Sequence, residues 1–284
     1  PGSCVCGRPP LLQTVAPPRL LRETAPSPAR EAAKSEAGEE RQGQGRMEGV
    51  LAVNNHWVKY AARVDGRDKI CRTVAYGSEF VLWLFSRSGN DVLRRWMKQV
   101  KNVKSGVGVA RKCFRFAAPL KDIDAVAHMK ERGTPATMKT ILHTFNAIYY
   151  FIDSIELLSI FQILPYNPPE VKRIRYRFWV VKTAMNISLA FITLARAKSN
   201  MAKVRRENGG DRQAVEAAKK LVFKAYLQLI VALTDIPVMF HNTSDWGKKK
   251  VPAHVMGASG AVGSMISCSL IWMEVGASLK AKSA

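Results

Sequence analysis

The sequence lacks the short motifs that mark the common enzyme classes. It contains no GxSxG nucleophile motif, no Walker A phosphate loop and no HExxH metal motif. Asp153 and Glu156 stand three residues apart and would share a helix face as an acid pair, but simple polarity of that face explains them better. We therefore predict that the protein is not an enzyme.

Cysteine and histidine are scarce and scattered. The five cysteines are Cys4, Cys6, Cys71, Cys113 and Cys268, a spacing that gives neither a disulfide framework nor a paired metal site. The five histidines nowhere approach one another at the spacing of helical metal ligands. The sequence therefore predicts no metal site and no cofactor.

Acidic residues are few beside the basic ones: 22 Asp and Glu stand against 44 Lys and Arg, which gives a net charge of +22. Such a charge implies an acidic partner, either nucleic acid or an anionic lipid surface. The chain shows no zinc-finger spacing, no aromatic RNA-binding signature and no basic region leading into heptads. Its basic residues instead cluster beside long apolar segments. We therefore expect an anionic phospholipid membrane as partner, and no nucleic acid.

The first 46 residues contain no methionine and no apolar run long enough for a signal peptide. They are rich in Pro, Ala, Arg, Gly and Glu, and the glutamates argue against the acid-poor signature of a transit peptide. We predict that residues 1–46 form a disordered N-terminal extension. It is either an extended tail or a translated upstream region, absent from a native protein that starts at Met47.

Residues 101–128 predict an amphipathic helix. One side carries apolar residues three or four positions apart, namely Val109, Cys113, Phe116, Leu120 and Ile123. A basic flank beside them includes Lys104, Arg111, Lys112 and Arg115. A helix of this kind lies in the plane of a bilayer, with its apolar face among the acyl chains and its cations at anionic headgroups. A core helix with a solvated basic edge would show the same periodicity.

Three segments carry a family resemblance. Residues 110–116, ARKCFRF, resemble the ARKxFR core of the peroxin-11 family, the membrane-elongation proteins of peroxisomes. Residues 65–78 are similar to that family's RDKxxRxxQYGS-type segment, although Ala75 stands where Gln is usual. The motif residues in this second segment are Gly66, Arg67, Asp68, Lys69, Arg72 and Tyr76. Residues 257–268 resemble the family's small-residue membrane segment.

The resemblance implies a protein of the peroxisomal membrane that acts in peroxisome proliferation. The amphipathic helix would insert into the cytosolic leaflet, curve and elongate the membrane, and so promote peroxisome fission. The same resemblance implies two partners, a dynamin-like fission GTPase and its membrane adaptor.

The order of segments predicts an all-α, membrane-associated protein. We expect amphipathic helices in residues 47–165, including the membrane-remodelling helix at 101–128. Residues 166–284, after a proline-rich break, are expected to form a helical hairpin and then a C-terminal transmembrane anchor at about 255–275.

The predicted anchor carries small residues at every fourth position. Gly260, Ser264 and Cys268 would form a face that lets two helices approach closely, which predicts a homo-oligomer. A glycine-rich loop in a soluble protein is the alternative. After the anchor, Lys280 and Lys282 resemble a dilysine signal read by coat proteins on the cytosolic side.

Two other functions stay open at this point. A metabolite channel or transporter of the peroxisomal membrane is suggested by Lys182, Lys224 and Asp235, which stand within apolar stretches. A peripheral scaffold that binds acidic proteins would also explain the basic charge.

Overall fold

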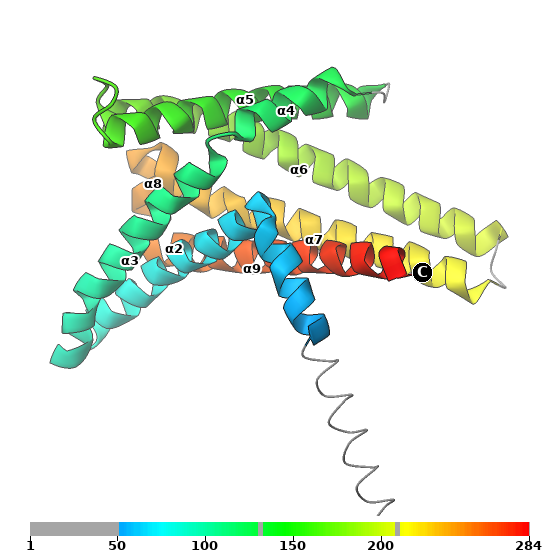
Figure 1. The fold of residues 1–284 in the computed structure, drawn as a ribbon, viewed down its shortest axis with the longest axis horizontal. Coiled ribbons are helices and arrows are strands. Elements are labelled where there is room, and N and C mark those ends of the chain that lie inside the picture. Colours follow the sequence, from blue (N-terminus) through cyan, green and yellow to red (C-terminus); the bar gives the residue numbers. More distant parts are fainter. Residues whose placement is uncertain (1–50, 130–132, 208–210, 284) are drawn as a thin grey trace, which may run out of the picture. The chain divides into compact units, whose positions relative to one another are not determined.

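The chain is built from long helices (Figure 1). The computed structural model describes residues 51–129, 133–207 and 211–283, and within these ranges every regular element is a helix. Residues 51–62 are helical, and they are followed by α2 (Val64–Arg87), α3 (Asp91–Arg115), α4 (Ala118–Ala127), α5 (Thr134–Ile160), α6 (Pro168–Glu207), α7 (Arg212–Thr243), α8 (Asp245–Lys250) and α9 (Ala253–Ser283). The predicted all-α class is confirmed. The predicted extension over residues 1–46 lies outside the described residues.

Three helices of the C-terminal half, α6, α7 and α9, are long and apolar enough to cross a membrane, judged by length and composition. Only 17% of the most apolar window of α6 and 28% of that of α7 are buried inside the protein. Water-soluble proteins rarely leave most of a long apolar helix segment uncovered. These helices confirm the predicted class of a membrane-associated helical protein.

Capping residues set two of the helix starts. The side chain of Asn90 accepts a hydrogen bond from the Val92 N–H at 2.8 Å, which begins α3 after the Ser-Gly-Asn break. Asp211 caps α7 by accepting from the N–H groups of Gln213 and Ala214. Both positions follow from the sequence, because Asn and Asp are preferred N-caps.

The single helix predicted over residues 101–128 is two helices in the structure. The first, α3, ends at Arg115, and α4 begins at Ala118 with Pro119 in its first turn. Proline has no N–H to donate and its ring clashes with the carbonyl four residues earlier, so a continuous helix cannot pass through this point. Phe116 therefore lies at a corner between the two helices.

Within the compact unit Val53–Ala284, α9 packs along both α2 and α7. A Cβ atom placed on Gly260 would lie 2.5 Å from the ring of Tyr76 on α2, so this contact needs glycine. Ser264 is completely buried, and the Cys268 Sγ lies 3.9 Å from the Thr73 hydroxyl of α2. The small-residue face of α9 is thus occupied by a helix of the same chain. Self-association between copies stays a prediction, and it would need another surface.

Beside its apolar core clusters, the fold buries several charged side chains and exposes several large apolar ones. Asp153, Glu156 and Arg175 are buried, whereas Phe116 and Leu120 are 51% and 69% exposed. Charged side chains in membrane-embedded helices face the protein interior and pair with one another, while apolar side chains face the lipid. Arg175 of α6 pairs with both buried carboxylates, and α6 and α7 leave most of their apolar windows uncovered, as this rule requires of spanning helices.

The contact at Gly260 gives a stability prediction. Gly260→Leu should lower the free energy of unfolding by at least about 1–3 kcal/mol, because overpacking forces α9 away from the Tyr76 ring. Thermal unfolding of the detergent-solubilised chain would measure it. Gly77→Leu is the matched control, since no heavy atom lies within 4 Å of a Cβ at that position. Equal stability of the two variants would contradict the close α2–α9 packing.

Candidate functional site

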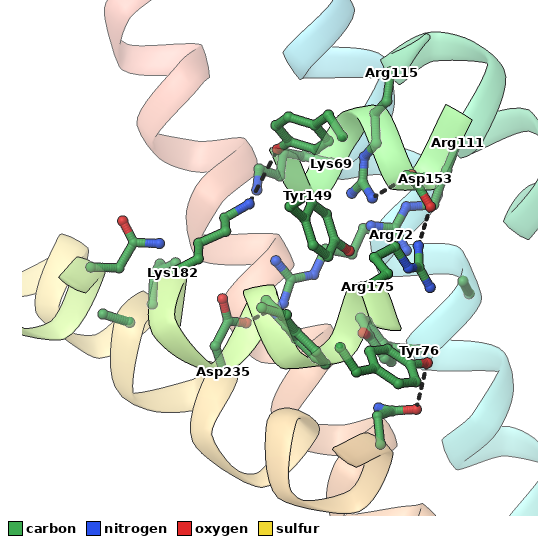
Figure 2. A pocket seen from close by; sticks show the side chains of 18 of the residues that line it. Lys69, Arg72, Tyr76, Arg111, Arg115, Tyr149, Asp153, Arg175, Lys182 and Asp235 are labelled. Carbon is green, nitrogen blue, oxygen red and sulfur yellow. Dashed lines mark hydrogen bonds and ion pairs between the residues drawn. The ribbon is translucent and has the colours of Figure 1, made fainter. Parts of the chain in front are cut away.

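A cavity of about 680 Å³ is lined by side chains of α2, α3, α5, α6, α7 and α9 (Figure 2). We refer to it as the charged cavity, because among the residues that the structure describes nine lysines and arginines but only four carboxylates line it. The cations are Lys69, Arg72, Lys104, Arg111, Lys112, Arg115, Lys172, Arg175 and Lys182, and the carboxylates are Glu79, Asp153, Glu156 and Asp235. The basic residues of the predicted amphipathic helix therefore face inward, toward this cavity.

Asp68 joins α2 to α3 behind the cavity wall. Its Oδ1 lies 3.2 Å from the Arg111 Nε and 2.7 Å from the Arg115 Nε, and its Oδ2 accepts a further bond from Arg115 at 2.9 Å. Arg67 adds a cation–π contact, 5.1 Å from the ring centre of Phe114. Two of the three sequence segments that carry the family resemblance, 65–78 and 110–116, are thus in direct contact through their charged residues.

A second cluster joins α3, α5 and α6. The Lys112 Nζ lies 3.2 Å from Asp153 and 2.8 Å from Glu156, and Arg175 of α6 pairs with both carboxylates. Arg115 reaches toward Asp153 at 3.8 Å and so connects this cluster with Asp68. The carboxylates of Asp153 and Glu156 are each surrounded by cations, which makes them structural charges rather than an acid pair.

Two further ion pairs complete the walls. Arg72 of α2 pairs with Asp235 of α7, and its guanidinium lies 5.4 Å from the ring centre of Tyr76. Lys104 of α3 pairs with Glu79 of α2. Since Asp235 stands within a helix that is apolar enough to span the membrane, its pairing with Arg72 removes the high cost of an isolated charge there.

Electrostatics keep the central carboxylates ionised. Burial alone would raise the pKa of Asp68, but the charges of Arg115 and Arg111 outweigh burial and hold the pKa well below its usual range. Burial likewise opposes ionisation of Asp153, and Arg175, Lys112 and Arg115 together lower its pKa. Neither group has a proton to donate near neutral pH. This network offers fixed charge, not acid–base chemistry.

The predicted membrane face is turned away from the charged cavity. Phe116, Leu120 and Ile123 are each more than half exposed, Cys113 is exposed, and Val109 is half-buried. Insertion of this face into lipid stays a prediction.

The predicted headgroup cations are engaged inside the protein. Arg111, Lys112 and Arg115 sit in the ion pairs with Asp68, Asp153 and Glu156, and their side chains are about 15% exposed. Lys104 pairs with Glu79 but is 42% exposed, which makes it the most accessible of the four. Their binding to lipid headgroups stays a prediction, and for the three enclosed cations it would require the ion pairs to open.

The remaining predicted positions have separate places. Gly66 packs against the backbone oxygen and ring of Tyr60. Lys280 and Lys282 fall at the end of α9, where the side chains lie outside the described part of the chain. In the described ranges, no group of three or more His, Cys, Asp or Glu side chains is arranged to hold a metal ion.

Sequence reasoning missed Arg175 and the joint role of Asp153 and Glu156. The available signal was the position of two carboxylates inside the apolar stretch 141–164, because charges in such a stretch need partners. Their partners were not identifiable, since Arg175 lies beyond a proline-rich break and Lys112 lies 41 residues earlier than Asp153.

Comparison with known proteins places these features in context. The sequence model of a family described as peroxisomal biogenesis factor 11 matches residues 54–272. The chain is 29% identical to peroxisomal membrane protein 11C of Arabidopsis thaliana over 222 residues, which covers 74% of this chain and 88% of the relative. It is 27% identical to peroxisomal membrane protein 11-1 of Oryza sativa subsp. japonica, with the same coverage. No solved structure matches at comparable significance.

The Asp68 contacts give a second stability prediction. Asp68→Asn should lower the free energy of unfolding by about 3–5 kcal/mol, because it leaves Arg111 and Arg115 buried without that carboxylate. Asp91→Asn is the control; it removes an exposed carboxylate 3.8 Å from Arg94 and should change stability by less than about 1 kcal/mol. Denaturant unfolding in detergent micelles would compare them. If the free energy of unfolding fell by the same amount in both variants, the Asp68 pairs would not hold α2 and α3 together.

Proposed function

The chain belongs to the peroxisomal biogenesis factor 11 family and is a peroxisomal membrane protein, and from this premise we propose that it elongates that membrane by inserting the apolar face of α3 and α4 into one leaflet. The observation that carries the proposal is the orientation of this face. Arg111, Lys112 and Arg115 at the end of α3 point inward to carboxylates. Phe116, Leu120 and Ile123 point outward and are more than half exposed.

Energetics support insertion of these side chains. Full burial of a Phe, Leu or Ile side chain contributes roughly 1.5–3 kcal/mol relative to leaving it in water. Phe116 and Leu120 stand at the corner where α3 gives way to α4, so two large exposed apolar side chains lie close together there. A bilayer is the apolar medium adjacent to a membrane-anchored protein.

Insertion at one side of a bilayer expands one leaflet relative to the other. Such a mismatch favours curvature, and many copies acting together would draw a peroxisome into a tubule. The buried ion pairs hold α3 against α2 and α5, so the corner acts as part of a rigid body and not as a loose segment. The rigidity would transmit the insertion to the spanning helices.

Exposed cations near the corner would hold it at an anionic surface. Lys121, on α4 beside the corner, is exposed; farther back along α3, Lys101 is exposed and Lys104 is partly so. Each Lys or Arg close to such a surface contributes about 1 kcal/mol. Self-association, and recruitment of a dynamin-like fission GTPase with its membrane adaptor, complete the proposal by family resemblance.

A second candidate function, a metabolite channel, is favoured by the charged cavity itself. Lys182 and Asp235 line it from helices that are apolar enough to span a membrane, as the channel hypothesis requires. Lys224 takes no part in it, because it pairs with Glu274 at a more exposed position.

Conductance separates the two functions. The full chain reconstituted into planar bilayers should show no stepwise conductance if membrane elongation is its activity. Regular conductance steps that Lys182→Glu changes in ion selectivity would favour the channel instead.

The corner gives the decisive cellular prediction. Phe116→Glu with Leu120→Glu should return peroxisomes to the length seen without the overexpressed protein. The two introduced carboxylates would have to enter the apolar part of the bilayer, which is costly. Peroxisome length, imaged against a matrix marker in cells expressing residues 47–284, is the measurement. Phe116→Leu with Leu120→Phe keeps the face apolar and should elongate peroxisomes as the original chain does. Undiminished elongation by the glutamate variant, with correct targeting, would rule out the corner as the inserted element.

A further inference from the structure

We infer that the charged cavity binds a phosphate-bearing anion, with Lys69 and Lys182 as the cations that hold it. The inference goes beyond membrane elongation and does not depend on the inserted corner. It begins from the charge balance of the cavity, where nine cations face four carboxylates and Asp68 behind the wall adds a fifth.

All five carboxylates are already engaged by other cations. Asp68 pairs with Arg111 and Arg115, whereas Asp153 and Glu156 pair with Lys112 and Arg175. Asp235 pairs with Arg72, and Glu79 pairs with Lys104. Over the described ranges, no carboxylate lies within ion-pairing distance of Lys69 or Lys182. Their charge is left over after the internal pairing is complete, as is that of Lys172, whose Nζ lies 5.7 Å from the ring centre of Tyr176.

The two lysines reach the same part of the cavity from different helices, α2 and α6 (Figure 2). The Lys182 Nζ donates to the Tyr150 hydroxyl at 3.3 Å and lies 4.7 Å and 4.6 Å from the ring centres of Tyr149 and Tyr150. Aromatic faces satisfy an ammonium group only in part. The chain therefore holds Lys182 in place without neutralising it.

Two other groups indicate that the electrostatic potential in this part of the cavity is positive. Arg72 is buried, and its Nε has no hydrogen-bond partner even though another guanidinium nitrogen pairs with Asp235. The charge of Lys182 lowers the pKa of the Tyr150 hydroxyl against the opposing effect of burial, and Arg115 and Lys69 act in the same direction. Both observations indicate a place where negative charge would be stabilised.

The size of the surplus favours phosphate over a single carboxylate. A phosphate monoester carries about −1.5 to −2 charges at neutral pH and three strong acceptor oxygens, so it can bridge lysines from two helices. Tyr149, Trp179 and Tyr176 supply an aromatic wall for whatever the phosphate is attached to. Two sources offer this chemistry: the headgroup of an anionic lipid that enters beside the spanning helices, and a free phosphorylated solute.

The test uses the full chain in detergent micelles and two probes. Inorganic pyrophosphate represents the free solute, and phosphatidic acid added to the micelles represents the headgroup, with phosphatidylcholine as the neutral comparison. At least one anionic probe should raise the unfolding temperature, because a ligand that binds only the folded state stabilises it. Lys69→Gln with Lys182→Gln should weaken binding of that probe at least tenfold. Lys203→Gln with Lys220→Gln is the control, since it removes two exposed charges outside the cavity.

Each outcome decides the inference. Stabilisation by pyrophosphate alone, by phosphatidic acid alone, or by both supports an anion site and identifies the source of the phosphate group. This holds provided that the cavity variant loses the stabilisation and the control variant keeps it. No stabilisation by either probe, or an equal loss in the cavity and control variants, overturns it. If the double variant does not fold, Lys69→Arg with Lys182→Arg and the single Lys182→Gln replace it. The site would be supported if the double arginine variant still bound the probe and Lys182→Gln bound it at least threefold more weakly. Any other result would overturn the site.

Discussion

The ion pairs around Asp68 are the interaction on which the other features of this protein depend. One carboxylate holds two arginines of α3, and one of these arginines reaches on toward Asp153 of α5. Charges removed from water must find partners with good geometry, and a misplaced partner is costly. The pairs therefore fix which faces of α2, α3 and α5 meet, more strictly than apolar packing does, because apolar contacts have no direction.

The outward direction of the corner follows from this constraint. Once Arg111, Lys112 and Arg115 are committed to internal carboxylates, the opposite face of α3 has to point away from the protein. That face carries Cys113 and leads into Phe116, so the internal pairing and the exposure of apolar side chains have one cause. A protein that pairs a cluster of charges in its interior and leaves large apolar side chains exposed is better suited to a membrane than to water.

Much of the fold was predictable from the sequence, and the limits were physical. Breaks at the Ser-Gly-Asn segment and before α6 follow from local residue preferences, and the long apolar runs predict the C-terminal helices. The break at Pro119 had a signal, but the apolar period continues across it and masks the interruption. The charged cavity was not predictable, because Asp68 and Arg115 are 47 residues apart and charge alone does not select one carboxylate among many. Periodicity also leaves open whether an apolar face meets protein or lipid, which is why the small-residue face of α9 suggested a second copy where α2 is the neighbour.

The packing of α9 against α2 has a consequence for biosynthesis. The groove that receives Tyr76 is made by Gly260, which the ribosome adds more than 180 residues later. The N-terminal helices cannot reach their final positions until α9 has been made, because α9 completes the environment of α2. Until then, the faces of α2 and α7 that pack against α9 stay without this neighbour, although Asp68 and Glu79 already have their partners on α3. Until α9 has been made, the apolar surface of the new chain is exposed and is best shielded by a chaperone or by the target membrane.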